Sequence, residues 1–78
     1  MTNTQTQTVH VTVLYPLPVS PFADAFLESA AFERGGKFIG SGADGDRDLA
    51  FDFPKYPHQF IEIAESCGCR VELATLDD

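Results

Sequence analysis

The chain has 78 residues, with five Lys and Arg against twelve Asp and Glu, and a formal net charge of −7. This length allows one domain. Because 44% of the residues are hydrophobic, a small core is expected rather than a disordered chain. The excess acid excludes direct binding to nucleic acid or to an anionic membrane, since both need a basic surface.

The N-terminal residues have neither a basic start nor an apolar stretch, so no secretory signal is expected. No apolar run approaches the ~20 residues that span a membrane. Two cysteines are too few for a disulfide scaffold. We therefore expect a soluble cytoplasmic protein, with residues 1–7 as a flexible polar tail and residues 8–78 as a single domain.

The first two predicted elements are a strand and a helix. The strand begins at Val9, where valines recur with period two, and prolines end it from Pro16 onward. The helix begins at Ser20-Pro21, a capping residue followed by proline in the first turn, and ends at Gly35-Gly36. Its predicted core face consists of Phe22, Ala23, Phe26, Leu27, Ala30 and Ala31, with Asp24 and Glu28 on the exposed flank.

The second half predicts two more strands, a helix and a final strand. A short strand at 37–39 enters a glycine-rich turn, and 47–53 is the clearest strand, with Leu49, Phe51 and Phe53 on one side. The second helix spans roughly 57–67. Its apolar side is predicted to contain Phe60, Ile61, Ile63, Ala64 and Cys67. The last strand, 69–76, turns Val71 and Leu73 inward.

This β-α-β-β-α-β order predicts an α+β ferredoxin-like sandwich. Its four strands form an antiparallel sheet in the order 4-1-3-2, with two helices on one face. The alternative is a three-stranded sheet in which residues 37–41 form only a loop edge. In the four-stranded arrangement His10 lies beside Asp48 or Asp52, where a His–Asp pair is either a surface pair or a general base.

Residues 40–45 match the dinucleotide-binding pattern G-x-G-x-x-G. That pattern needs a helix after it, whereas here a strand follows and three aspartates would repel a phosphate, which favours a hairpin. Asp44, Asp46 and Asp48 alternate as in a calcium loop, but Leu49 and Lys55 occupy the positions of its required Gly and Glu. A weak divalent-ion site remains the alternative.

Cys67 and Cys69 make up only half of a zinc site, and His10 and His58 do not complete it. We expect both cysteines to pack as small hydrophobic residues, with a redox-active pair as the alternative. No metal or cofactor is expected.

The predicted open face of the sheet lacks the aromatic and basic residues of ferredoxin-like RNA-binding domains. Its outward positions are His10, Thr12, Asp48, Ala50, Asp52, Arg70, Glu72 and Ala74. Acylphosphatases share this topology, but they use an arginine-bearing loop after the first strand, and residues 15–18 contain no arginine.

Acidic residues recur at regular intervals along the second half of the chain. Asp44, Asp46, Asp48 and Asp52 follow one hairpin arm, and Glu62 and Glu65 lie one helical turn apart. Such rows can imitate phosphates toward a basic groove, although solubility alone also accounts for acid on a small domain. With its short length and acidic α+β profile, the chain resembles the small phage-encoded anti-CRISPR inhibitors, some of which block DNA-binding grooves.

The resemblance implies a non-enzymatic inhibitor that occupies a basic nucleic-acid-binding surface of a partner complex. Its partner-binding residues would be Asp44, Asp46, Asp48, Asp52, Glu62 and Glu65, with Tyr56 or Phe32 as an aromatic anchor. The alternatives are a small dimeric regulatory or ligand-binding domain that pairs through a sheet edge or the open face, and an enzyme that uses His10. We expect a monomer or a weak homodimer.

Overall fold

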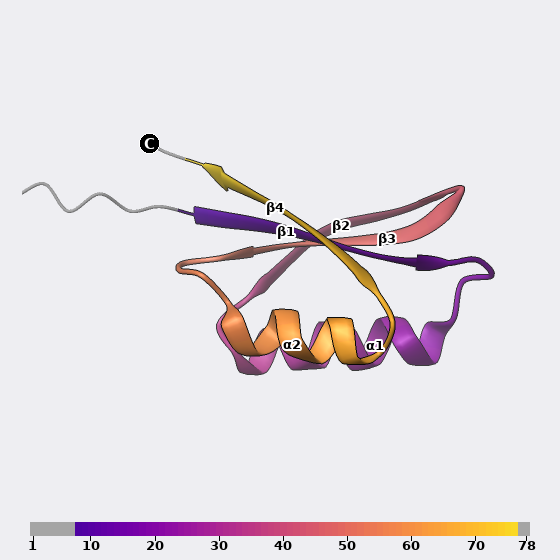
Figure 1. The fold of residues 1–78 in the computed structure, drawn as a ribbon, viewed down its shortest axis with the longest axis horizontal. Helices are drawn as coiled ribbons and strands as arrows, with labels where there is room; N and C mark the ends of the chain where they lie inside the picture. The colour runs from indigo at the N-terminus through magenta and orange to yellow at the C-terminus, as the bar shows by residue number, and fades with distance from the viewer. Residues whose placement is uncertain (1–7, 77–78) are drawn as a thin grey trace, which may run out of the picture.

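The computed structural model describes residues 8–76, so the predicted tail of residues 1–7 lies outside the described part. The elements follow the predicted order, and both helices cover the same face of one sheet (Figure 1). They are β1 (Thr8–Pro16), α1 (Pro21–Glu33), β2 (Lys37–Asp44), β3 (Asp46–Phe53), α2 (His58–Ser66) and β4 (Arg70–Leu76).

The sheet has the order β2-β3-β1-β4, and every neighbouring pair is antiparallel. This confirms the ferredoxin-like prediction, since the same order read from the other edge is 4-1-3-2. The three-stranded alternative is wrong, because residues 37–44 form a full strand paired with β3. Residues 40–45 belong to the β2–β3 hairpin, where the positive φ of 85° at Gly45 accounts for a glycine in the turn.

The core lies between the sheet and the helices. Val9, Val11 and Val13 of β1 alternate inward, as do Leu49, Phe51 and Phe53 of β3. The Phe60 ring of α2 is fully buried against two of these aromatic side chains, with ring centroids 5.3 Å from Phe51 and 5.2 Å from Phe53. These edge and tilted contacts are the geometry that aromatic pairs prefer.

Helix α1 begins as predicted, but it faces the core differently. Ser20 caps it by accepting a hydrogen bond from the Ala23 amide at 3.1 Å. The buried positions are Asp24, Leu27, Ala30 and Ala31. Phe22 and Phe26, predicted to be core residues, are 85% and 47% exposed, and Asp24, predicted to lie on the flank, is only 8% exposed.

The second half of the chain follows its predicted pattern more closely. In α2 the buried residues are Phe60, Ile61 and Ala64, whereas Cys67, predicted on the apolar side, is exposed at the C-cap. In β4 Val71 packs against the core. Leu73 points to the same side as predicted, since it pairs with the buried Val11, but it is 45% exposed on this edge strand.

Candidate functional site

The open side of the sheet carries the aspartates of the β2–β3 hairpin. Strand β3 turns its odd-numbered residues toward the helices, so Asp46, Asp48 and Asp52 point away from them. Asp44 pairs with Asp46 at the hairpin end, which places it on the same side. We call these four aspartates the acidic sheet face. Glu72 of β4 lies on the same side of the sheet, because Thr12 of β1 pairs with Glu72 on one side and with Ala50 of β3 on the other.

His10 and Asp52 form a hydrogen-bonded pair on this side of the sheet. The β1–β3 register sets them opposite each other, and Nδ1 of His10 lies 2.8 Å from Oδ1 of Asp52. The predicted His–Asp contact is therefore present with Asp52. Both side chains are about one-third exposed on the open side of the sheet. Neither of them lines the two pockets described around residues 15–27, 34, 53–60 and 67–69.

Two basic side chains share the face with these acids. Nη2 of Arg70 lies 3.4 Å from Oδ2 of Asp46, and Lys37 is opposite Asp52 in the register. Asp44 and Asp48 form no salt bridge with any residue in the described part of the chain. These two carboxylates are therefore available to a partner without breaking a pair.

A glycine of β2 lies beside the Asp48 carboxylate. Gly42 of β2 is opposite Asp48, and a Cβ atom at Gly42 would lie 3.1 Å from Oδ2 of Asp48. The glycine thus leaves room for the carboxylate to lie across β2. The Gly40–Gly45 segment, which matches a nucleotide-binding pattern in sequence, forms part of the β2–β3 hairpin here.

The six predicted partner-binding residues do not form one surface. Glu62 and Glu65 are exposed on α2, which covers the opposite face of the sheet from the four aspartates (Figure 1). The two predicted aromatic anchors are exposed but do not lie beside the hairpin. Phe32 is on α1, and Tyr56 follows the end of β3 that is far from the hairpin, with its ring 4.5 Å from that of His58.

A second polar cluster, not predicted from the sequence, lies on the helix side of the sheet. Asp24 of α1 accepts hydrogen bonds from Nη2 of Arg47 at 2.6 Å and from Nε of Arg47 at 3.1 Å. The Tyr15 hydroxyl donates to Oδ1 of Asp24 at 2.6 Å and accepts from the Ser20 amide at 2.9 Å. We call this group the Tyr15–Asp24–Arg47 cluster.

The pKa shifts in the cluster follow from these contacts. The hydrogen bonds from Arg47, with a smaller contribution from Tyr15, hold the pKa of Asp24 below its ordinary value, against the opposing effect of burial. Burial, followed by the bond to Asp24, raises the pKa of Tyr15. At neutral pH Asp24 is therefore ionised and Tyr15 keeps its proton. The cluster joins α1 to the sheet through these hydrogen bonds.

The sequence contained one sign of this cluster. Arg47 has the same parity in β3 as Leu49, Phe51 and Phe53, so the alternation that predicts the core also turns Arg47 toward the helices. A cation in that position needs an acidic partner nearby. Asp24, early in the helix that covers this face, supplies it.

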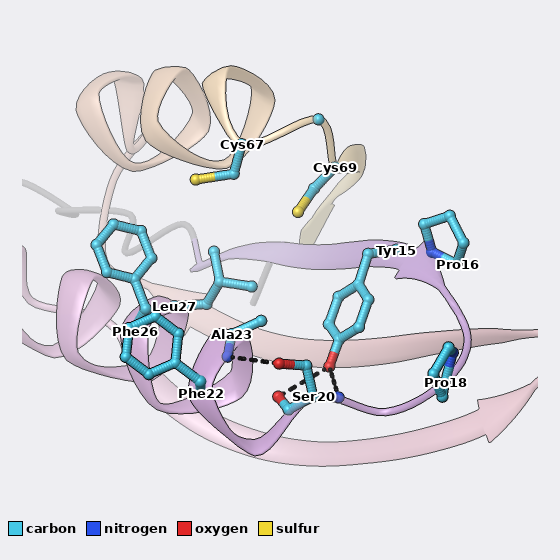
Figure 2. A pocket seen from close by; sticks show the side chains of 11 residues that line it. Tyr15, Pro16, Pro18, Ser20, Phe22, Ala23, Phe26, Leu27, Cys67 and Cys69 are labelled. Carbon is cyan, nitrogen blue, oxygen red and sulfur yellow. Dashed lines mark hydrogen bonds between the residues drawn. The ribbon is translucent and has the colours of Figure 1, made fainter.

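A pocket of about 450 Å³ opens beside the cluster, between the start of α1 and the turn that joins α2 to β4 (Figure 2). Its walls are mainly apolar, and they include Phe22, Phe26 and Leu27. The volume suits a small ligand. However, the Tyr15 hydroxyl is already hydrogen-bonded to Asp24 and to the backbone of Ser20, so the pocket presents mostly apolar surface.

Cys67 and Cys69 lie on the rim of this pocket, and both thiols are free (Figure 2). The prediction that both pack as hydrophobic residues is correct for Cys69, which contacts the core, and wrong for the exposed Cys67. Burial, followed by the neighbouring Cys67, raises the pKa of the Cys69 thiol.

Iodoacetamide is therefore expected to alkylate Cys67 faster than Cys69 at about pH 8, because the thiolate is the reactive form and the better exposed thiol is also the easier to reach. Mass spectrometry after partial labelling measures the two rates. Cys69→Ser and Cys67→Ser, each with one thiol left, serve as matched controls. Equal labelling of the two thiols would contradict the assignment.

Within residues 8–76 no three His, Cys, Asp or Glu side chains gather closely enough to hold a metal ion. Over the same residues no helix has the length and hydropathy needed to cross a membrane. No protein-family model matches the chain, and the comparisons with curated proteins and with solved structures find no match either. The fold and the surface together define a ferredoxin-like α+β domain with an acidic open sheet face.

Proposed function

We propose that the protein is a non-enzymatic inhibitor whose acidic sheet face occupies a basic, nucleic-acid-binding surface of a partner complex. The supporting observation is that all four aspartates of the β2–β3 hairpin lie on one open side of the sheet, where Asp44 and Asp48 have no cationic partner in the described part of the chain. Glu62 and Glu65 lie in the other layer and are not included in this surface.

The regular spacing of side chains along a strand suits this role. Alternate residues of a strand are about 6.6–6.8 Å apart, so Asp46 and Asp48 present charges at a fixed and regular spacing. Negative charges held in this way are attracted to the basic residues that bind phosphates, and they accelerate the encounter of the two proteins. Because these charges are exposed to solvent, salt screens their attraction to the partner, and the affinity should fall as the salt concentration rises.

The test compares two variants of equal net charge. Asp44→Asn/Asp46→Asn/Asp48→Asn removes three acids from the acidic sheet face, and Glu33→Gln/Glu62→Gln/Glu65→Gln removes three from the helices. The immobilised protein is used to recover partners from host lysate at low and at high salt, and the affinity of the purified partner is then measured. We expect the aspartate variant to bind about tenfold more weakly, since exposed charge pairs contribute about 0.2–1 kcal/mol each.

The glutamate variant should bind like the wild type, because its substitutions lie on the other side of the sheet. Nucleic acid that the partner binds should compete with the protein for the partner. An unchanged affinity of the aspartate variant, or simultaneous binding of protein and nucleic acid to the partner, would contradict the proposal.

A further inference from the structure

Strand β2 forms one edge of the sheet, and no other strand among residues 8–76 pairs with its outer side. An uncovered edge presents a row of backbone N–H and C=O groups that can pair with another strand, and proteins commonly guard such edges with charges or proline. Between Lys37 and Asp44 the edge carries neither, since its residues are Phe38, Ile39, Gly40, Ser41, Gly42 and Ala43. The opposite edge, β4, carries Arg70 and Glu72.

We propose that β2 pairs antiparallel with β2 of a second copy of this chain, forming an eight-stranded sheet across a twofold axis at Ser41. The charges at the two ends of β2 favour antiparallel pairing with a second β2. It begins with the cation Lys37 and ends with the anion Asp44, so antiparallel self-pairing brings opposite charges together at both ends. Neither residue forms an ion pair within the described part of a single chain.

The side-chain directions agree with this register. In the β2–β3 ladder Lys37 and Asp44 pair with Asp52 and Asp46, so both lie on the open side of the sheet. Residues 37 and 44 are odd- and even-numbered, so in a regular strand their side chains would point to opposite sides of the sheet. The register shift between Phe38 and Gly40 turns them to the same side. With Ser41 opposite Ser41 and Gly40 opposite Gly42, the same shift brings Lys37 opposite Asp44 of the second copy.

Exposed apolar residues lie next to the same edge. Phe38 and Ile39 are 44% and 43% exposed on β2 itself. Phe38 has the direction of Ala43, because these two residues pair with Phe51 and Arg47 on the helix side of β3. In the proposed register Phe38 therefore lies opposite Ala43 of the second copy, and self-pairing removes part of its ring from water.

The occupant is a second copy rather than an unrelated strand because the charges at the two ends match each other. The inference does not depend on the proposed inhibitor function, since its test uses the purified protein alone. The pairing engages Asp44, but it leaves Asp46, Asp48 and Asp52 of the acidic sheet face open, because strands added at an edge extend a sheet without covering its faces.

Sedimentation velocity between about 10 µM and 1 mM tests the proposal. We expect a concentration-dependent shift from the 8.5 kDa chain to twice that mass. Lys37→Glu and Asp44→Lys should each weaken the dimer about tenfold, because each places like charges together at both ends of the seam. The double variant Lys37→Glu/Asp44→Lys should restore it, which a folding defect would not do.

A second pair of variants tests the edge itself. Ser41→Lys places two like charges at the twofold axis and should abolish the dimer, whereas Ala74→Lys on the exposed edge strand β4 should leave it intact. A chain that remains monomeric at 1 mM, a dimer that persists with Ser41→Lys, or a double variant no better than the single ones would overturn the proposal.

Discussion

Phe60→Ala is expected to leave the domain largely unfolded at 25 °C. The ring is fully buried against Phe51 and Phe53, and removing a buried phenylalanine side chain costs about 3–5 kcal/mol. A core in a domain of this length rarely supplies more than ~3–5 kcal/mol in total. The loss therefore equals the whole expected stability. Circular dichroism during thermal and urea denaturation measures it.

Phe22→Ala is the matched control, because it deletes the same side chain from a residue that is 85% exposed. Its effect on the free energy of unfolding should stay within about 0.5 kcal/mol. Phe60→Leu, which keeps most of the volume, should retain a measurable unfolding transition. If Phe22→Ala destabilised the domain as much as Phe60→Ala, the orientation of α1 described above would be wrong.

The strands could be predicted well because their signal is local. The alternation in residues 47–53 depends on the pleat of the strand alone, and the β1–β3 register then brings His10 to Asp52. The sequence predicts a strand only over residues 37–39, whereas β2 continues to Asp44. Residues 40–44 contain two glycines and a serine, which carry little strand signal, and their pairing with β3 decides their structure.

The orientation of α1 could not be read from its own residues. Large apolar side chains at Phe22 and Phe26 suggest a core face, and a carboxylate at Asp24 suggests an exposed one. In the fold Asp24 faces the sheet, where it contacts Tyr15 of β1 and Arg47 of β3. Burial of a charge is unfavourable unless such partners are present, and a helical periodicity contains no information about them.

The distribution of acid is less simple than the net charge suggests. Asp24, one of the twelve acidic residues, is paired inside the fold, Asp46 and Asp52 have cationic neighbours, and Glu62 and Glu65 lie in the other layer. What distinguishes the acidic sheet face is therefore its geometry rather than its total charge. Asp44 and Asp48 lie on the β2–β3 hairpin, and Gly42 leaves space beside Asp48.

Asp24→Asn is expected to destabilise the protein by about 1–3 kcal/mol at pH 7, because the charged acceptor of Arg47 and Tyr15 is lost inside the fold. Folding lowers the pKa of Asp24. The pair therefore stabilises the native state fully above the ordinary carboxyl pKa of about 3.9, and this contribution is lost as the pH falls through the lowered value. Urea unfolding of both proteins from pH 7 downward measures the difference.

The gap between wild type and variant should be widest near neutrality and close progressively in acid, because protonation of Asp24 makes the wild type resemble the variant. Glu28→Gln is the control. It removes the same charge one turn further along α1 from a residue with no hydrogen bond or salt bridge in the described part of the chain, so its effect should stay within about 0.5 kcal/mol. A gap that is independent of pH would mean that Asp24 stabilises the fold through packing rather than through its charge.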